Sequence, residues 1–567
     1  MLHFTIDHEM SEIVSPMKKF VSQSTFILQI NDYFRSMRLL QIFILSLLPL
    51  TSAAQEFPFS VVLNPVYSSP DIALQSYAFG VWENRVLLIG GRKDGLHQRQ
   101  PFASFAAEGM PANISILDLN NYTSTPVEFD IIDTPLVEQF SSTNIQFYQT
   151  DSILWLVGGY GYSATSQDHV TYPMLKAINL KTFFEAQDNG TYAFPSFQYL
   201  IDDRFAVTGG SLKKLNGVYY LAGGHKFEGR YNPMNGPSFT QTYTEKVSRF
   251  IPTLTESGIQ VEWLSEFNDP ALLHRRDLNV MEGIDSNGQM NFTLFSGVFQ
   301  QVADLPFMNC VEVNEQGVTE IPEFQHLLNQ YHTAHVSLYD EVLQKQHYLF
   351  LGGISEYYYE GDVLTQNVDV PFTKNIACVT RNANNQWVEE LNPSVLPAFL
   401  GSSSEIILNQ NLPFIEGDII DLNSAYDGSE ILLGHMLGGI RSTGQNIFWT
   451  NNGTQSAPND TLFEVWLIPN SVDVASAIAL PKNIFTVYPN PISGKFRIEF
   501  SCHQNCNAEL FVFNSNGKQV AHDKLGKFSP GKHYHENRSK LFKRPGKYTL
   551  QLKLNEEVIV QQLLVEP

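Results

Sequence analysis

A short apolar run that ends in two glycines recurs along most of this chain. Clear copies end at Gly90-Gly91, Gly158-Gly159, Gly223-Gly224, Gly352-Gly353 and Gly438-Gly439. The gap between the third and fourth copies is wide enough for one more, and Asn291–Gly297 supplies it, with Ser296 at the first glycine position. Six copies of a segment longer than a hairpin predict a fold of repeats, in which each repeat buries its faces against its neighbours.

Each doublet ends one strand of a longer repeat. The surrounding residues alternate between apolar and polar, turn residues recur at short intervals, and no long stretch has the 3.6-residue period of an amphipathic helix. We expect one strand before each doublet strand and two after it. The preceding strands are predicted to begin near Tyr77, Asn144, Arg204, Arg276, His332 and Glu405. The chain is therefore predicted to be all-β, with six repeats of four strands.

The last repeat lacks a fourth strand, and the first has one to spare. Thr461–Leu467 has the pattern of a third strand, and no further strand follows before the polar segment that begins at 471. Phe57–Asn64 precedes the first inner strand and has the pattern of an outer one. We predict that it completes the last sheet, which leaves no sheet edge open.

The first 54 residues are not expected to belong to the fold. Arg38, the apolar run Leu39–Leu50 and Ser52-Ala53-Ala54 have the order of a secretory signal peptide with its core at 37–54, and residues 1–36 precede it without a comparable pattern. The apolar run is shorter than the roughly 20 residues that a membrane span needs. We therefore expect a mature chain that starts near Gln55, carries the repeats over 55–470 and has no transmembrane span.

A second β region follows a short polar linker at 471–483. Within 484–567, the segments Gly494–Phe500, Glu509–Asn514 and Gly546–Leu552 alternate and are separated by hairpin turns, which predicts a small immunoglobulin-like β-sandwich. With Tyr488-Pro489-Asn490-Pro491 near its start, this region resembles the C-terminal sorting domain of the type IX secretion system of Bacteroidota, of the type A or Por kind.

That resemblance implies how the protein is handled. Proteins with such a domain cross the periplasm and pass the outer membrane, and they are released or attached at the surface after the domain is removed. The type IX secretion machinery is therefore the implied partner of residues 484–567. The implied location is secreted or at the outer-membrane surface.

The six four-stranded repeats with glycine doublets resemble the kelch family of β-propellers. The resemblance implies a six-bladed kelch-like β-propeller over 55–470, with ligand sites at one mouth of the central channel. Enzymes among kelch-like propellers include galactose oxidase and sialic acid mutarotase. The copper site of the oxidase, which has a tyrosine crosslinked to a cysteine, is not expected because Cys310 and Cys378 lie at third-strand positions away from the channel.

Composition and charge narrow the choice of partners. The 567 residues are 43% hydrophobic, and the net charge is −22 without any basic run, which argues against nucleic acid or an anionic membrane surface. The four cysteines form no Cys-x-x-Cys pair and no His-Glu-x-x-His motif occurs, so neither a metal nor a cofactor is expected. Cys502 and Cys506 are close enough in sequence to form a disulfide, and the sequence leaves their state open.

The starts of two neighbouring inner strands, at 274–277 and 331–335, carry the richest polar clusters. Arginines bind carboxylates and histidines transfer protons, and Glu405 on the next inner strand is expected to approach both clusters. The catalytic candidates are His332, His335, Arg275 and Glu405, and the ligand-binding candidates here are His274, Arg275 and Arg276. The alternative is that these groups make buried hydrogen bonds between repeats.

A second group of ligand-binding candidates follows the doublets. Arg92, Tyr160 and His225 are expected on loops that decorate one face. Tyr357 and Tyr358 belong to a tyrosine triplet after Gly353, where exposed rings would give a glycan a surface to stack on.

Three functions are compatible with these patterns. The preferred hypothesis is an exported binding module that recognises a glycan or an extracellular protein. The first alternative is a metal-independent enzyme acting on sugars, of the mutarotase or epimerase type, at the channel mouth. The second is a structural surface or adhesion component. Whether the protein is an enzyme stays open at this point, with binding favoured.

Overall fold

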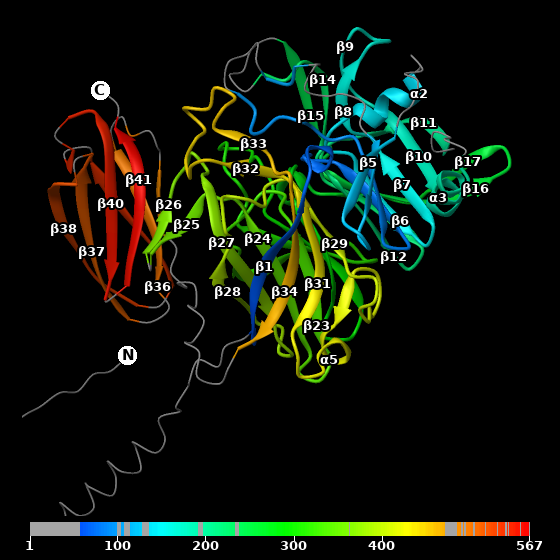
Figure 1. The fold of residues 1–567 in the computed structure, drawn as a ribbon. Helices are drawn as coiled ribbons and strands as arrows, with labels where there is room; N and C mark the ends of the chain where they lie inside the picture. Colours follow the sequence, from blue (N-terminus) through cyan, green and yellow to red (C-terminus); the bar gives the residue numbers. More distant parts are fainter. Residues whose placement is uncertain are drawn as a thin grey trace, which may run out of the picture. The chain divides into compact units, whose positions relative to one another are not determined.

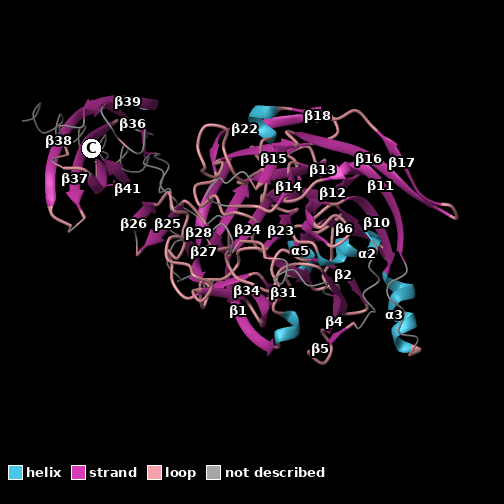
Figure 2. Cartoon of the chain, turned by 90° about the horizontal axis from the view of Figure 1, so that it is seen from above, coloured by secondary structure: helices cyan, strands magenta, loops and turns pink. Residues whose placement is uncertain are grey.

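The computed structural model describes residues 57–470 except 99–103, 107–113, 128–134, 191–196, 233–237 and 362. In the C-terminal region it describes residues 485–565 except 489–491, 493–494, 503–504, 516, 530, 539–540, 543 and 556. The predicted signal core at 37–54 and the linker at 471–483 lie outside the described residues. The described chain is β-structure with a few short helices, as predicted (Figure 1, Figure 2). No helix in this described part is long and apolar enough to cross a lipid bilayer.

Six antiparallel sheets follow one another along residues 57–470, and we number them in chain order with the strands given from one edge to the other. Sheet 1 is β2 (Ala78–Trp82), β3 (Arg85–Ile89), β4 (Ile114–Asp118) and β5 (Thr123–Pro126). Sheet 2 is β6 (Gln146–Thr150), β7 (Ile153–Val157), β10 (Pro173–Asn179) and β11 (Phe197–Ala206). Sheet 3 is β12 (Ser211–Leu215), β13 (Val218–Ala222), β16 (Lys246–Thr255) and β17 (Gly258–Trp263), with β18 (Phe267–Asn268) beside β16.

The remaining three sheets have the same order. Sheet 4 is β19 (Asn279–Ile284), β20 (Met290–Phe295), β21 (Asn309–Val313) and β22 (Val318–Gln325). Sheet 5 is β23 (His335–Asp340), β24 (Lys345–Ile354), β27 (Phe372–Arg381) and β28 (Trp387–Val395). Sheet 6 is β29 (Ser404–Leu408), β31 (Ile431–Gly438), β34 (Thr461–Pro469) and β1 (Phe59–Ser68).

The first strand of the chain completes the last sheet. β1 pairs antiparallel with β34, from Phe59 opposite Pro469 to Ser68 opposite Thr461 (Figure 1). The prediction that the N-terminal strand supplies the missing strand of the last repeat is therefore confirmed. The pairing joins residues about 400 positions apart, so the two ends of the array are held by a full ladder of backbone hydrogen bonds.

The start of one inner strand was placed wrongly from the sequence. Arg204 lies in β11, the outer strand of sheet 2, and the inner strand of sheet 3 begins at Ser211. β11 is ten residues long and its polar positions resemble a new strand start. The turn that separates the two strands follows Arg204 instead of preceding it.

Each sheet packs against the next, and sheet 6 packs against sheet 1. A separate cluster of buried apolar side chains fills each of the six contacts. The cluster between sheets 6 and 1 contains Ile407 and Leu437 from one sheet and Val86 and Leu88 from the other, all with no exposed surface. The hydrophobic core of 57–470 is therefore divided into six wedges, and every sheet is buried on both faces.

A ring of backbone hydrogen bonds links the inner ends of the six sheets. In each bond the amide of one residue donates to the carbonyl oxygen of its counterpart in a neighbouring sheet. The bonds run from Asn144 to Ser76 (2.9 Å), Gly209 to Asn144 (3.3 Å), Asp277 to Gly209 (2.7 Å), His332 to Asp277 (2.8 Å), Ser403 to His332 (2.8 Å) and Ser76 to Ser403 (3.1 Å). Ser76 accepts the first bond and donates the sixth, so the ring is closed.

The glycine doublets join each sheet to the next one. Every doublet glycine has a positive φ, and the amide of the second glycine donates to a carbonyl just before the inner strand of the following sheet. These bonds run from Gly91 to Ser142 (2.9 Å), Gly159 to Val207 (2.9 Å), Gly224 to Arg275 (2.7 Å), Gly353 to Leu400 (2.7 Å) and Gly439 to Leu74 (2.8 Å). A Cβ on the first glycine would collide with the neighbouring sheet, which explains why glycine occupies this position.

Sheet 4 makes the same connection with serine in place of glycine. Ser296 has a φ of 54° and no exposed surface, and its hydroxyl donates to the carbonyl oxygen of Asn329 at 2.7 Å. A side-chain donor here replaces the backbone donor of the other five sheets. The departure from the doublet pattern is therefore compensated locally.

Long connections after the doublet strands carry structure that the sequence analysis treated as loops. β8 (Tyr160–Ser163), β9 (Asp168–Thr171), β14 (His225–Gly229) and β15 (Phe239–Tyr243) form an extra sheet, and β25 (Tyr357–Glu360) with β26 (Val363–Gln366) and β32 (Ile440–Ser442) with β33 (Ser456–Pro458) form hairpins. The short helices are η1 (Pro70–Ile72), α2 (Pro135–Glu138), η3 (Gln139–Ser141), α3 (Leu180–Asp188), α4 (Pro270–Leu273) and α5 (Leu422–Ala425). Tyr160 and His225 therefore begin strands instead of lying on loops.

One connection, which we call the strap (409–430), runs from sheet 6 over two neighbouring sheets. Its strand β30 (Ile419–Asp421) pairs in parallel with the inner strand β23 of sheet 5. Its tip reaches sheet 4, where the amide of Asp418 donates to a carboxylate oxygen of Glu282 at 2.6 Å. Ile419 and Ile420 have no exposed surface, so this part of the strap is buried in the fold.

The C-terminal region has two sheets around one core. β35 (Phe485–Tyr488), β36 (Lys495–Cys502) and β39 (Gly531–Arg538) form one sheet, and β38 (Gln519–Phe528), β37 (Cys506–Asn514), β40 (Gly546–Leu554) and β41 (Glu557–Val565) are paired in that order. Buried side chains of both sheets form a single cluster, as the predicted sandwich requires. Cys502 and Cys506 form a disulfide, and Cys310 and Cys378 are buried and belong to no disulfide.

The doublet geometry predicts a large loss of stability on replacing Gly158 with alanine. Gly158 has a φ of 61°, and a Cβ would collide with the Val207 carbonyl oxygen. Gly190 has a φ of 66°, and a Cβ there would meet nothing within 4 Å. Gly190→Ala should cost about 1 kcal/mol through its backbone conformation alone, and Gly158→Ala should cost more than about 3 kcal/mol. Equal shifts in the thermal midpoint of the two variants would contradict this interpretation.

Candidate functional site

Two cavities meet at the hydrogen-bonded ring. The first has a volume of about 490 Å³ and is lined by Arg92, Phe105, Tyr160, His225, Arg276 and Trp449 among others; we call it the aromatic cavity. The second has a volume of about 390 Å³ and is lined by Tyr148, Lys213, Glu282, His332, His335 and Glu405 among others; we call it the acidic cavity. Four residues, Ser76, Asn144, Asp277 and His332, line both cavities.

Side chains crossing the ring form the boundary between the cavities. The amide nitrogen of Asn144 donates to Asp277 Oδ1 at 3.0 Å, and Arg276 binds Asp277 Oδ2 at 3.1 Å. Asn144 and Asp277 come from sheets 2 and 4, and the ring residue of sheet 3 between them is Gly209. The missing side chain at Gly209 leaves room for this bridge, because a Cβ there would approach Asp277 Oδ1 to 3.0 Å.

The walls of the aromatic cavity are built by the long connections after the doublet strands. All six sheets contribute, with wall residues that include Phe105, Tyr160, Phe227, Phe299, Phe372 and Trp449. These connections are where the repeats exceed the length that four strands require. The extra length of the repeats is therefore used to build one cavity.

Two arginines, Arg92 buried and Arg276 half-buried, carry their charge into this aromatic environment. Arg92 is 5% exposed, and its guanidinium lies 4.1 Å from the ring centre of Phe105 and binds Asp94. Arg276 lies 5.1 Å from the ring centre of Phe299 and within 6.0 Å of two further rings. A guanidinium over an aromatic face keeps its charge while losing water. Each of the two already pairs with one aspartate, and among the described residues Arg276 Nε has no hydrogen-bond partner.

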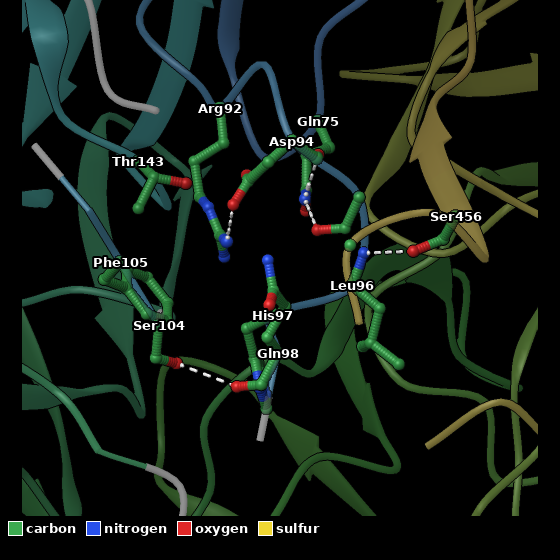
Figure 3. A network of polar contacts seen from close by, with 12 residues as sticks. Gln75, Arg92, Asp94, Leu96, His97, Gln98, Ser104, Phe105, Thr143 and Ser456 are labelled. Atoms are coloured by element: carbon green, nitrogen blue, oxygen red, sulfur yellow. Dashed lines mark hydrogen bonds and ion pairs between the residues drawn. The ribbon is translucent and has the colours of Figure 1, made fainter. Parts of the chain in front are cut away.

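The segment that carries Arg92 is fixed by bonds to its own sheet and to sheet 6 (Figure 3). The side-chain Nε2 of Gln75 donates to the carbonyl oxygens of Asp94 (2.8 Å) and Gly95 (2.7 Å), and the backbone amide of Leu96 donates to Ser456 Oγ at 2.9 Å. The Leu96 carbonyl oxygen also accepts from Asn451 at 2.6 Å. Arg92 and the residues that follow it are thus held rigidly at the cavity wall.

Two histidines in the wall of the aromatic cavity, His97 and His225, are neutral. Burial, followed by the charges of Arg92 and Arg276, lowers the pKa of His97 to about 4. Burial and Arg276 also lower the pKa of His225 well below its usual value, and its Nδ1 lies 2.8 Å from the amide nitrogen of Gln241. Positive charge in the cavity therefore resides on the arginines, and the histidines act as neutral hydrogen-bonding groups.

An exposed tryptophan stands at the rim. Trp449 is 57% exposed, and its indole nitrogen donates to Asp369 Oδ1. Asn446 donates to the other oxygen of Asp369 at 3.1 Å, and Phe448 packs against Trp449 edge to face. A large ring that is both oriented and exposed next to a cavity is suited to stacking on a sugar ring.

The acidic cavity contains the predicted histidine and glutamate pair. His332 Nε2 lies 3.0 Å from Glu405 Oε1. Burial opposes the charging of His332, but Glu405 outweighs it and raises the pKa of this histidine. The ring of His335 lies 6.5 Å from that of His332, and burial together with Lys213 lowers the pKa of His335 to about 4. Three of the four catalytic candidates are therefore brought together, and the pKa values of the two histidines are shifted in opposite directions.

Arg275, the fourth catalytic candidate, lies elsewhere. Its guanidinium has no exposed surface and donates to the carbonyl oxygens of Ser296 and Asn309 and to Asn309 Oδ1. It spans the strands of sheet 4 and lines neither cavity. The prediction that Arg275 joins the histidines is wrong, because Arg275 and Arg276 lie next to each other in extended chain and point in opposite directions.

His274 also lies outside both cavities. Its Nδ1 is 2.6 Å from Glu245 Oε1, and its ring stacks on Tyr243 at 3.8 Å between centres. This partly buried arrangement joins two segments of the wall. It matches the structural alternative stated from the sequence.

The tyrosine triplet is not an exposed aromatic surface. Tyr357 is 2% exposed and belongs to the core between sheets 4 and 5, and Tyr358 is 7% exposed. The expectation that these rings offer a stacking surface for a glycan is therefore wrong. The exposed ring is Trp449, which the sequence analysis did not single out.

Sequence patterns pointed to part of the aromatic cavity. Arg92, Tyr160, His225 and Arg276 were predicted as ligand-binding residues, and the structure places all four in its wall. His97, Phe105 and Trp449 were missed because they lie in long connections without a repeat pattern. The one available signal was the clustering of aromatic residues in those connections.

Comparison with known proteins identifies the C-terminal region. Residues 486–566 match the family described as "Secretion system C-terminal sorting domain". No curated protein sequence matches the chain. One similar solved structure is described as "Structure of YjhT"; it is 10% identical, with 70% of this chain and 97% of that chain covered and a TM-score of 0.38. A likeness this weak carries no argument about function.

The sorting domain settles where the protein acts. Such a domain marks proteins that type IX secretion exports to the cell surface or the extracellular space. The protein is therefore exported, and residues 486–566 are the part that the type IX machinery handles. Any ligand of the two cavities must be sought outside the cell.

The His332–Glu405 pair predicts a measurable change in histidine titration. Glu405→Gln removes the charge that raises the pKa of His332 while burial, which lowers it, remains. The pKa of His332 should therefore fall below its usual value of about 6.5, as measured by an NMR titration of the histidine ring protons. Glu416→Gln, at an exposed position of the strap, is the matched control and should leave the titration of His332 unchanged. An unaltered His332 titration in the Glu405 variant would contradict the assignment.

Proposed function

We propose that this protein is an exported six-bladed, kelch-like β-propeller that binds a carboxylate-bearing glycan in the aromatic cavity. The proposal has two parts, the closed fold and the ligand class. Each rests on a different set of contacts.

Two features support a closed propeller. The ring of six backbone hydrogen bonds starts and ends at Ser76, and an apolar cluster fills each of the six contacts between sheets, including the one between sheet 6 and sheet 1. The pairing of β1 with β34 adds the closing strand. A closed radial array leaves only short, protected sheet edges, which is the physical advantage of this architecture.

The ligand class follows from the two arginines. Arg92 and Arg276 come from sheets 1 and 4 and line one cavity of about 490 Å³ walled by aromatic rings. Guanidinium groups bind carboxylates through paired hydrogen bonds, and aromatic faces pack against sugar rings. The volume suits one or two sugar residues. This juxtaposition of one buried and one half-buried arginine with aromatic rings is the observation that carries the proposal.

A second candidate function is proton transfer on a sugar in the acidic cavity, as in a metal-independent mutarotase or epimerase. The observation that favours it is the pair of histidines whose pKa values are shifted in opposite directions. Neutral His335 can accept a proton, and the carboxylate of Glu405, 3.0 Å from His332, favours the protonated form of that histidine, which can donate one. This function would use the cavity on the other side of the ring from the arginines.

Binding of an acidic sugar should depend on Arg276 and Trp449. The full-length chain should bind an oligogalacturonate more tightly than the neutral galactose oligomer in isothermal titration calorimetry. Arg276→Gln should weaken binding of the acidic oligomer by more than about tenfold, because it removes a buried charge-assisted contact. Trp449→Ala should weaken binding of both oligomers by about three- to tenfold through lost stacking.

Two control variants address non-specific effects in this experiment. Arg204→Gln removes an exposed arginine from β11, and Tyr199→Ala removes a ring that is 41% exposed on the same strand. Both should bind like the unaltered chain. Equal binding of the acidic and neutral oligomers, or losses of the same size in the control variants, would overturn the proposed ligand class. Absence of any glycan binding would favour the structural or adhesion alternative.

A catalytic role makes a separate prediction. If the acidic cavity transfers protons, the full-length chain should accelerate anomer exchange of a sugar acid, as followed by NMR exchange spectroscopy. His335→Asn should then abolish the acceleration, because it removes the neutral base. No acceleration by the unaltered chain would exclude this function for the sugars tested.

A further inference from the structure

The acidic cavity contains a buried carboxylate with an unused oxygen. Glu282 lies on β19, the inner strand of sheet 4, and is 1% exposed. Its Oε2 accepts a hydrogen bond from the Asp418 amide at 2.6 Å, and among the described residues its Oε1 has no hydrogen-bond partner. A buried carboxylate oxygen without a partner is costly in the folded protein. Lys213 acts on the Glu282 carboxylate through its charge and Tyr148 through a side-chain hydrogen bond, and the open position at Oε1 is what a further donor would fill.

The strap holds Glu282 in place. Gly417, with a φ of 56°, packs directly against the Glu282 carboxylate, where a side chain would collide with it. Asp418 follows at the rim of the cavity, so a second carboxylate lies beside the first. β30 pairs the strap with sheet 5. Sheets 4, 5 and 6 therefore all contribute to the placement of the two carboxylates.

Aromatic rings line the same cavity. Phe79 and Phe147 lie with their ring centres 5.1 Å apart. Tyr148 lies next to Glu282, and burial, followed by the charge of Glu282, raises the pKa of this tyrosine. Aromatic faces next to carboxylates are the usual surroundings of a bound ammonium group. A hydrated metal ion would instead require several oxygen ligands at once.

We propose that the acidic cavity is a second ligand site, which takes the ammonium group of an organic amine between Glu282 and Asp418 with its carbon chain against the rings of Phe79 and Phe147. The ammonium group supplies the hydrogen-bond donor that Glu282 Oε1 lacks. The site is independent of the proposed glycan site, because it lies on the other side of the Asn144–Asp277 bridge.

The surrounding charges set the pH dependence of binding. Burial raises the pKa of Glu282 to about 7, Lys213 on β12 opposes this rise, and Asp418 adds to it. His335, His332 and Glu405 line the cavity farther along. Protonated Glu282 cannot pair with an ammonium group, so the affinity should rise about tenfold from pH 6 to pH 8, as the ionised fraction rises.

The test uses propylammonium as the probe, with propan-1-ol and propionate as its neutral and anionic counterparts. Binding to the full-length chain is measured by ligand-observed saturation-transfer NMR at pH 6 and pH 8. Propylammonium alone should bind, and more tightly at pH 8. Glu282→Gln should weaken its binding about tenfold and remove most of the pH dependence, whereas Lys213→Gln should strengthen it about threefold by removing a repelling charge.

The Glu282 and Lys213 substitutions are expected to change the affinity in opposite directions, which a general loss of structure would not do. Asp418→Asn keeps the backbone donor to Glu282 and should weaken binding about threefold, and Glu323→Gln, at an exposed position on β22, should have no effect. Preferential binding of propionate, binding of calcium in place of the amine, or an unchanged affinity in the Glu282 variant would each overturn the proposal. None of these outcomes depends on whether a glycan binds in the aromatic cavity.

Discussion

The structure of residues 57–470 depends on how each sheet is bonded to the next at its inner end. The doublet amides and the ring of backbone hydrogen bonds place the end of one sheet against the start of its neighbour, and only glycine, or serine with its own hydroxyl, fits there. The apolar wedges between the sheets supply most of the stabilisation, but they are not directional. The hydrogen bonds at the inner ends fix the spacing and the register of the sheets.

The same bonds determine where side chains can act. The residue that follows each doublet leaves the sheet on one face, which is why Arg92, Tyr160 and His225 line one cavity although they lie far apart in sequence. The ring residues themselves divide the axis into two compartments. One compartment concentrates arginine and aromatic side chains, and the other concentrates carboxylates and titrating histidines. A chain with a net charge of −22 thus places two arginines in one aromatic cavity, together with the carboxylates of Asp277, Asp304 and Asp369.

Export constrains which ligands these cavities can meet. The sorting domain directs the protein to the cell surface or beyond, where glycans, proteins and small amines are the available partners. The Cys502–Cys506 disulfide belongs to this C-terminal region and is compatible with an oxidising compartment on the export route. The two cavities belong to residues 57–470, so export and ligand binding are assigned to different parts of the chain.

Much of the architecture could be predicted from the sequence, because it follows from local patterns of residues. The doublets, the alternation of apolar residues and the spare strand at Phe57 required only periodicity, and they predicted the six sheets and the closing strand. The sites required tertiary structure. Adjacent Arg275 and Arg276 were indistinguishable in sequence, yet strand geometry sends one into sheet 4 and the other into the cavity. Trp449 and Glu282 gained their surroundings from chain segments far away in sequence, and no local pattern records such contacts.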